Sequence, residues 1–393
     1  MKSTMHIWPQ EIEKAEKTLT VSARVEWGTK AAQTLWYRLP LAYESALSPN
    51  ADPFAIALLF AAMRSADRMV VHSEVSPSLL RNLMEFQAAW ASWLPDQLSI
   101  VPIVAEDERE PALEHSSPLA ISAFSGGVDS SYTVFRHTLA PQGRHTQLLT
   151  TGLFVHGFDI PLTQAEVFER ATQRAARMLH SVGMEVLPIA TNFREVMAPY
   201  IRWENSFGSA IASCLLLLQG KFRIGLIPSS YSYQTLSLPY GSNPLTDPML
   251  GNSCLSIIYD GAHQRRFGKI KALSSWPEAL ENLRVCWQGP QLDRNCCQCE
   301  KCIRNILTFR VVQAELPPCF SADVSDRQIR SLRLKGSALD GLRSLAFVAR
   351  QQGINASWVN AVETVVRRSK RLNFLKQTIK PYLEKSPKLL RNK

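Results

Sequence analysis

The sequence predicts an α/β fold with a doubly wound parallel sheet, and two observations support this prediction. Between residues 119 and 227, short apolar segments typical of strands alternate with longer segments of helical periodicity. The composition is globular, with 46% hydrophobic and 20% charged residues among 393, which excludes a disordered chain, a collagen and a coiled-coil rod. This length allows two or three domains of roughly 100–200 residues.

Residues 1–105 are expected to form a small α/β region of their own. Alternation and apolar runs predict strands over 19–27 and 33–38, a helix over 54–63, a short strand at 69–71, a helix over 77–90 and a strand at 100–104. A capping residue followed by proline marks each helix start, at Asp52–Pro53 and Ser76–Pro77. The acidic residues 105–117 predict a linker.

Residues 118–310 are expected to form the central domain. Its predicted elements are strands over 119–124, 152–155, 186–189 and 224–227 and helices over 163–182 and 209–219. Gly183 and Gly220 follow the two helices as stop signals. Residues 311–393 have a helical pattern and predict a C-terminal helical region.

The basic charge is concentrated at the C-terminus. The formal net charge is +10, and residues 364–393 hold ten basic residues and one acid. Such a tail could bind nucleic acid or an acidic protein partner. The simpler interpretation is a solvated helix face, because only Phe374 and Tyr382 could stack on bases there.

No membrane partner is expected. The sequence contains no apolar run of roughly 18 residues, the length that a membrane helix needs, and residues 1–16 are too polar for a secretory signal. The sequence therefore predicts a cytoplasmic protein. Disulfides are disfavoured there, so the eight cysteines require another role.

The most specific motif is a glycine-containing loop after the first strand of the central domain. Its residues are Ser125, Gly126, Gly127, Val128, Asp129, Ser130 and Ser131. Glycines let the main chain approach a ligand closely, and successive N–H groups and a helix N-terminus then favour an anion. The loop is therefore predicted to bind the polyphosphate of a nucleotide such as ATP. It lacks the Gly-Lys-Ser/Thr of the Walker loop and the glycine spacing of dinucleotide-binding proteins.

This Ser-Gly-Gly-x-Asp-Ser motif resembles the loop of the PP-loop ATP pyrophosphatases. The resemblance implies a Rossmann-like sheet of the adenine-nucleotide α-hydrolase type and cleavage of ATP between its α- and β-phosphates with Mg²⁺. Asp129 would anchor the loop or hold Mg²⁺, and Ser130 would bind phosphate. Lys269 would neutralise pyrophosphate, although a solvated turn is the alternative. His156 is a further candidate for nucleotide contact, or else it caps a strand.

Four cysteines follow the predicted sheet with the spacing C-x9-C-x2-C-x2-C. They are Cys286, Cys296, Cys299 and Cys302. Four thiolates can enclose a tetrahedral Zn²⁺ in a closed structural site, so we expect zinc, with an iron–sulfur cluster as the main alternative. Cys297 could replace Cys296 as a ligand.

A PP-loop sheet followed by this cysteine spacing is similar to the zinc-binding 7-cyano-7-deazaguanine synthase family. The similarity covers residues 119–305, roughly half of the chain. Residues 203–205 stand where that family has its substrate loop, and the terminal regions do not belong to it. The resemblance implies a deazaguanine-like acceptor, and the longer chain would suit nucleobase modification or anti-phage defence.

The expected function is that of an ATP-dependent ligase. It would adenylate a carboxylate or amide of a small-molecule acceptor, and ammonia or an amine would then displace AMP. A homodimer is one expected assembly. Two alternatives are an ATP-dependent RNA thiolase, with Cys297 or another cysteine carrying sulfur, and a non-catalytic ATP-binding sensor or assembly subunit.

Overall fold

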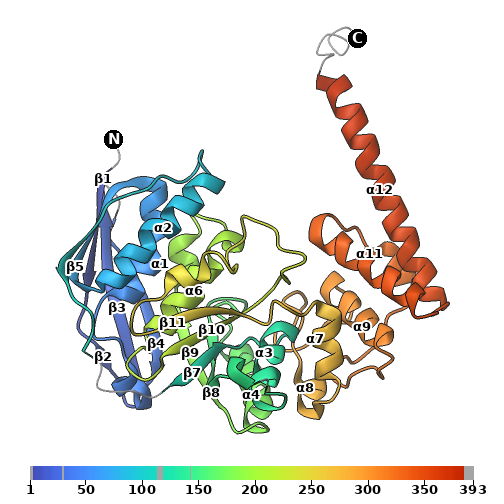
Figure 1. Ribbon diagram of the computed structural model, residues 1–393, viewed down its shortest axis with the longest axis horizontal. Helices are drawn as coiled ribbons and strands as arrows, with labels where there is room; N and C mark the ends of the chain where they lie inside the picture. Colours follow the sequence, from blue (N-terminus) through green and yellow to red (C-terminus); the bar gives the residue numbers. More distant parts are fainter. Residues whose placement is uncertain (1–2, 29–30, 113–117, 142, 385–393) are drawn as a thin grey trace. The chain divides into compact units, whose positions relative to one another are not determined.

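The computed structural model describes residues 3–28, 31–112, 118–141 and 143–384 (Figure 1). The chain divides into two compact units, Met1–Trp287 and Gln288–Lys393. No helix among the described residues combines the length and apolarity needed to cross a membrane. Residues 385–393 of the basic tail and 113–117 of the expected linker lie outside the described part.

A sheet of eleven strands forms the centre of the first unit (Figure 1). The strands are β1 (Ser3–Pro9), β2 (Glu13–Lys14), β3 (Thr18–Trp27), β4 (Gln33–Pro40), β5 (Ala66–Val75), β6 (Ile103–Glu108), β7 (Leu119–Ala123), β8 (Leu148–His156), β9 (Glu185–Thr191), β10 (Ile224–Pro228) and β11 (Ser256–Asp260). Their order is β11-β10-β7-β8-β9-β4-β3-β1-β5-β6, with β2 paired to β3. Neighbours from β11 to β9 are all parallel, which confirms an α/β protein with a mostly parallel sheet.

Helices cover the sheet in the first unit. They are α1 (Asp52–Ser65), α2 (Pro77–Trp93), α3 (Val128–Thr138), α4 (Ala165–His180), α5 (Phe193–Met197), α6 (Trp203–Leu216), α7 (Arg266–Leu273) and α8 (Pro277–Asn282), with the 3-10 helices η1 (Leu41–Ala46), η2 (Gly143–His145) and η3 (Asp247–Leu250). Every residue of α1 from Asp52 to Met63 is buried. Because α1 packs against β1, β5, α2 and α6, it needs no polar face.

The N-terminal strands do not form a separate domain, contrary to the expectation for residues 1–105. Strand β4 pairs antiparallel with β9 through Tyr37 and Arg38, so one sheet continues through both regions. One hydrophobic core also runs through both, because α1 packs on α6. The compact division therefore falls after Trp287. The expected linker also starts later than residue 105, because β6 extends to Glu108.

A buried polar network strengthens this junction. Asp52 is inside α1 and does not cap it, because Ala51 is the N-cap. Its carboxylate accepts hydrogen bonds from Ser76 N at 2.8 Å and Asn252 Nδ2 at 2.6 Å. Burial raises the pKa of Asp52, and these hydrogen bonds offset part of the rise. The network thereby joins α1 to the turn before β11.

The carboxyl ends of β7 to β11 lie along one edge of the sheet, because these strands are parallel. The strands that follow β7 in the chain first lie on one side of it, as β8 and β9, and then on the other, as β10 and β11. In open α/β sheets, ligands bind at the point where the strand order reverses in this way. The loop after β7 lies at that point.

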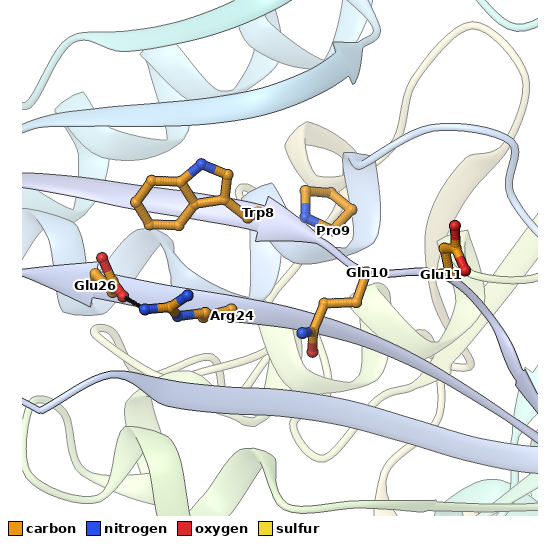
Figure 2. A pocket seen from close by; sticks show the side chains of 6 residues that line it. All are labelled: Trp8, Pro9, Gln10, Glu11, Arg24 and Glu26. Atoms are coloured by element: carbon orange, nitrogen blue, oxygen red, sulfur yellow. Dashed lines mark ion pairs between the residues drawn. The ribbon is translucent and has the colours of Figure 1, made fainter.

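A shallow pocket of about 420 Å³ lies on the N-terminal strands β1 and β3 and the residues that follow β1 (Figure 2). Its lining residues are Trp8, Pro9, Gln10, Glu11, Arg24 and Glu26. Arg24 forms an ion pair with Glu26, and Glu11 adds a second acid. The lining therefore has more negative than positive charge and does not favour a phosphate ligand.

The second unit is helical, as the sequence predicts for the residues after 310. Its helices are α9 (Glu300–Val311), α10 (Asp326–Ser331), α11 (Gly336–Gln351) and α12 (Ser357–Glu384). Helix α11 packs against α9 and α12, and α12 also packs against α10. Leu342, Val359 and Val362 are fully buried between these helices. Ser325 and Gln328 form a capping box at the start of α10.

Candidate functional site

The predicted phosphate loop connects β7 to α3. Strand β7 ends at Ala123 and α3 begins at Val128. Gly126 has a φ angle of +72°, a left-handed conformation that glycine adopts without steric cost. The N–H groups in the first turn of a helix have no acceptor within the helix. Gly127 is the N-cap of α3 and has no side chain that could accept a hydrogen bond from them. The loop therefore presents main-chain donors at a helix N-terminus.

Serine hydroxyls brace this loop from within. Ser130 Oγ accepts a hydrogen bond from Ser125 N at 3.2 Å and donates to Gly127 O at 3.2 Å. Ser131 Oγ, in the first turn of α3, is buried and has no hydrogen-bond partner among the described residues. An unsatisfied buried hydroxyl costs about 1–3 kcal/mol, so a bound ligand or water that reached it would be stabilised.

Arg284 contacts the loop, and the sequence did not predict its role. Its main-chain N–H donates to Gly126 O at 2.7 Å, and its Nε donates to Ser125 O at 3.3 Å. Its Nη2 donates to Asp159 Oδ2 at 3.5 Å in the turn after β8. No local pattern marks this arginine, because it is 157 residues from Gly127 and follows the short helix α8.

Asp129 and Lys269, two predicted catalytic residues, form a partly buried ion pair beside the loop. Lys269 Nζ donates to Asp129 Oδ1 at 2.9 Å, and Arg266 Nη2 donates to Asp129 Oδ2 at 2.8 Å. Lys269 is 2% exposed and also donates to Ser229 O at 2.6 Å and Ser229 Oγ at 3.0 Å. Lys269 is therefore buried on α7, not on a solvated turn, and Asp129 connects α3 to α7.

A second buried network holds α3 against β11, and its acid was not predicted. Asp260, the last residue of β11, accepts from Thr133 Oγ1 at 2.7 Å and Arg136 Nη1 at 2.8 Å. His137 Nε2 lies 3.2 Å from the same carboxylate, and His137 Nδ1 accepts from Gln147 N, so Nε2 carries the proton. Burial alone would raise the pKa of Asp260, but His137, Arg136 and Thr133 together lower it below its usual value. The charged network fixes the orientation of α3.

His156 forms its contacts with residues that follow β8 and not with the phosphate loop. Its Nε2 lies 2.9 Å from Pro161 O, and its ring stacks on Phe168 with centroids 4.3 Å apart. Burial lowers the pKa of His156, and the hydrogen bond to the Pro161 carbonyl offsets part of this shift. These contacts hold the turn after β8 in place. They fit the structural interpretation of His156, in which it caps its strand, and not contact with a nucleotide.

The four predicted cysteine ligands come together. The sulfur atoms of Cys286, Cys296, Cys299 and Cys302 all lie within 4.8 Å of one another. Cys299 N donates to Cys296 Sγ at 3.3 Å and Cys302 N donates to Cys299 Sγ at 3.4 Å. Four sulfur atoms this close together could bind a metal ion such as zinc.

Cys297 is not part of this cluster. It has a φ angle of +58°, a left-handed conformation that is uncommon for residues other than glycine. Its Sγ lies 3.7 Å from Asn295 O and 3.7 Å from Ser321 Oγ, and the residue is 3% exposed. Of the two alternatives in the sequence, Cys296 is therefore the cluster member.

The structure thus assembles the predicted site in part. The loop from Ser125 to Ser131, Asp129 and Lys269 lie together at the carboxyl edge of β7, and the cysteines form a separate cluster. His156 contacts the turn that follows its own strand.

The chain was also compared with known proteins. No family model, no curated protein and no solved structure matches it.

Proposed function

We propose that this chain is a PP-loop enzyme that binds ATP at Ser125–Ser131 and transfers AMP to a small-molecule acceptor. The observation that supports this most directly is the glycine loop between β7 and α3, at the point where the strand order reverses. In order along the chain, the five parallel strands are arranged 5-4-1-2-3, which matches the first five strands of the Rossmann order 3-2-1-4-5-6 read from the other edge and supports a Rossmann-like sheet.

The residues of the loop fit a polyphosphate. Gly126 and Gly127 let the main chain approach the ligand, the first turn of α3 contributes N–H donors, and Ser131 has a buried hydroxyl without a described partner. Preorganised donors of this kind stabilise the charge that builds up on departing pyrophosphate. Mg²⁺ bound with ATP would supply further charge neutralisation.

We also propose a chemical class for the acceptor. The loop motif and the cysteine spacing both favour an enzyme like the 7-cyano-7-deazaguanine synthases, so the acceptor is a deazaguanine-like carboxylate or amide. Its oxygen would attack the α-phosphorus of ATP, pyrophosphate would leave, and ammonia or an amine would then attack the activated carbon and expel AMP. A role in nucleobase modification or anti-phage defence follows from this acceptor class.

We further propose that Cys286, Cys296, Cys299 and Cys302 hold Zn²⁺ in a closed structural site. Four thiolates and no open ligand position are typical of structural zinc. A Cys₄ iron–sulfur cluster is the alternative, and an absorbance spectrum together with metal analysis of the purified protein distinguishes the two.

The test of the enzymatic proposal is product analysis with ATP, Mg²⁺ and a deazaguanine carboxylate plus ammonia. AMP and pyrophosphate in equal amounts are expected for the wild type, and none for the double variant Asp129→Ala/Ser130→Ala. Asp107→Ala, at a half-exposed surface position, is the matched control and should retain turnover. Unchanged turnover in the double variant would show that the loop is not the site.

The same assay separates the alternatives. Bound but intact ATP would indicate a sensor or assembly subunit. An RNA thiolase would lose RNA affinity steeply with added salt, and its sulfur carrier would have to be accessible, whereas Cys297 is 3% exposed.

A further inference from the structure

We infer that Arg284 is a positioning residue that sets the direction of the phosphate-loop N–H groups. This inference depends on the proposed ATP site, but the contacts that support it belong to the loop itself. Arg284 is 8% exposed and follows α8. It contacts two successive carbonyl groups of the loop, one through its side chain and one through its main chain.

Because the peptide bond is planar, these two contacts also set the direction of the N–H groups of Gly126 and Gly127. In a planar trans peptide, the C=O and N–H groups point in opposite directions. The Ser125 carbonyl is directed at Arg284 Nε, and the Gly126 carbonyl is directed at Arg284 N. The N–H groups of Gly126 and Gly127, which belong to those same two peptides, therefore both point away from Arg284. Two adjacent donors on one side of the backbone form a small anion-binding concavity.

The Gly127 N–H group makes only a weak hydrogen bond within the protein, which a ligand could replace. Its contact with Ser125 Oγ is 3.4 Å long, which is longer than the roughly 2.7–3.2 Å of ordinary N–H···O hydrogen bonds. A phosphate oxygen would accept a shorter, charge-assisted hydrogen bond from the same donor. The donor is thus oriented in advance without being tightly bound.

The side chain of Arg284 also connects the loop to the neighbouring strand. Its Nη2 lies 3.5 Å from Asp159 Oδ2, and its guanidinium carbon lies 5.8 Å from the centroid of the Phe154 ring on β8. A lysine could not reproduce this arrangement, because an ammonium lacks the planar set of donors that contacts two groups in fixed directions. The guanidinium therefore holds the loop at a set position relative to β8.

Arg284→Met separates the side-chain contribution from the main-chain one. The variant retains the N–H that donates to Gly126 but loses the contacts with Ser125 and Asp159. Arg174→Met is the matched control, because the half-buried Arg174 also donates to a main-chain carbonyl, that of Glu281. Arg284→Lys preserves the charge and should lie between the wild type and Arg284→Met in every measurement.

The first measurement needs no nucleotide. Hydrogen–deuterium exchange of peptides covering residues 124–131 in the full-length protein should be about tenfold faster in Arg284→Met at the hydrogen-bonded amides of Phe124, Ser125 and Ser131, because a lost hydrogen bond to a charged group corresponds to roughly a tenfold change or more. Peptides from α1, in the core of the same unit, should exchange as in the wild type. Equal exchange of the loop in both proteins would overturn the inference.

The second measurement connects the inference to function. Calorimetric titration with a non-hydrolysable ATP analogue and Mg²⁺ should show affinity weakened roughly 10- to 100-fold in Arg284→Met, with kcat reduced in addition to a higher KM for ATP. If the wild type binds no nucleotide, the proposed function fails, while the exchange result still decides the role of Arg284. If the wild type binds and Arg284→Met binds within twofold of it, only the positioning role is wrong.

Discussion

Replacing Asp129 with asparagine should destabilise the first unit by about 3 kcal/mol. Lys269 is 2% exposed, and its ammonium group donates to Asp129 Oδ1 and to the carbonyl and hydroxyl of Ser229. Removing one partner of a buried ion pair costs about 3–5 kcal/mol, because the other charge stays buried without compensation. The lower end applies here, since the Asp129 side chain is 22% exposed and asparagine retains an acceptor oxygen.

A double-mutant cycle with Lys269→Met isolates this electrostatic cause. The methionine variant removes the buried charge and leaves Asp129 paired with Arg266, so it should cost less than Asp129→Asn. The double variant should cost about 2 kcal/mol less than the sum of the single ones. Urea unfolding at constant m value gives the free energy of unfolding of the wild type, the two single variants and the double variant. As a control, Asp107→Asn at a half-exposed position should change this free energy by less than about 0.5 kcal/mol. Additivity within about 0.5 kcal/mol, or no cost for Asp129→Asn, would refute the reasoning.

Three further predictions concern the metal cluster, a buried acid and a close backbone approach. Cys299→Ser should lose bound zinc in elemental analysis and unfold at lower denaturant; full metal content would contradict the assigned cluster. Burial raises the pKa of Asp247 to about 7, so the folded state binds the proton more tightly than the unfolded state. Relative to Asp247→Asn, the wild type should lose up to about 4 kcal/mol as the pH rises from about 4 to 7, at about 1.36 kcal/mol per pKa unit; a difference independent of pH would contradict this. Gly208→Ala should cost about 3 kcal/mol or more, because the new Cβ would lie 1.9 Å from the main-chain oxygen of Gly241; a midpoint within error of the wild type would show that the backbone yields there.

The central part of the fold was predictable because its signals are local. The strand over 119–124 corresponds to β7 (Leu119–Ala123), and the strand over 186–189 lies within β9 (Glu185–Thr191). Each is a short apolar run next to a turn, which the chain itself specifies. The cysteine cluster was predictable for the same reason, since its last three members lie within seven residues.

The strands and helices expected in the N-terminal region are present, but its continuity with the central sheet was missed because strand pairing is non-local. Nothing in residues 33–40 indicates that β4 pairs with β9, which is more than a hundred residues later. The acidic composition around residue 110 indicated a linker, yet Glu110 accepts hydrogen bonds from Ser78 and Ser253. The sequence alone does not distinguish an acidic residue that is solvated in a linker from one that joins two segments by hydrogen bonds.

Residue order alone was enough to recognise the glycine loop, the alternation of strands and helices around it and the group of cysteines, because each depends on the conformational preferences and spacing of neighbouring residues. The folded structure was needed to show that the N-terminal strands extend the same sheet, that Lys269 is buried against Asp129, and that Arg284 contacts two loop peptides. These features require segments that are distant in the chain to share one core or one ion pair, and such contacts form only when the whole unit packs.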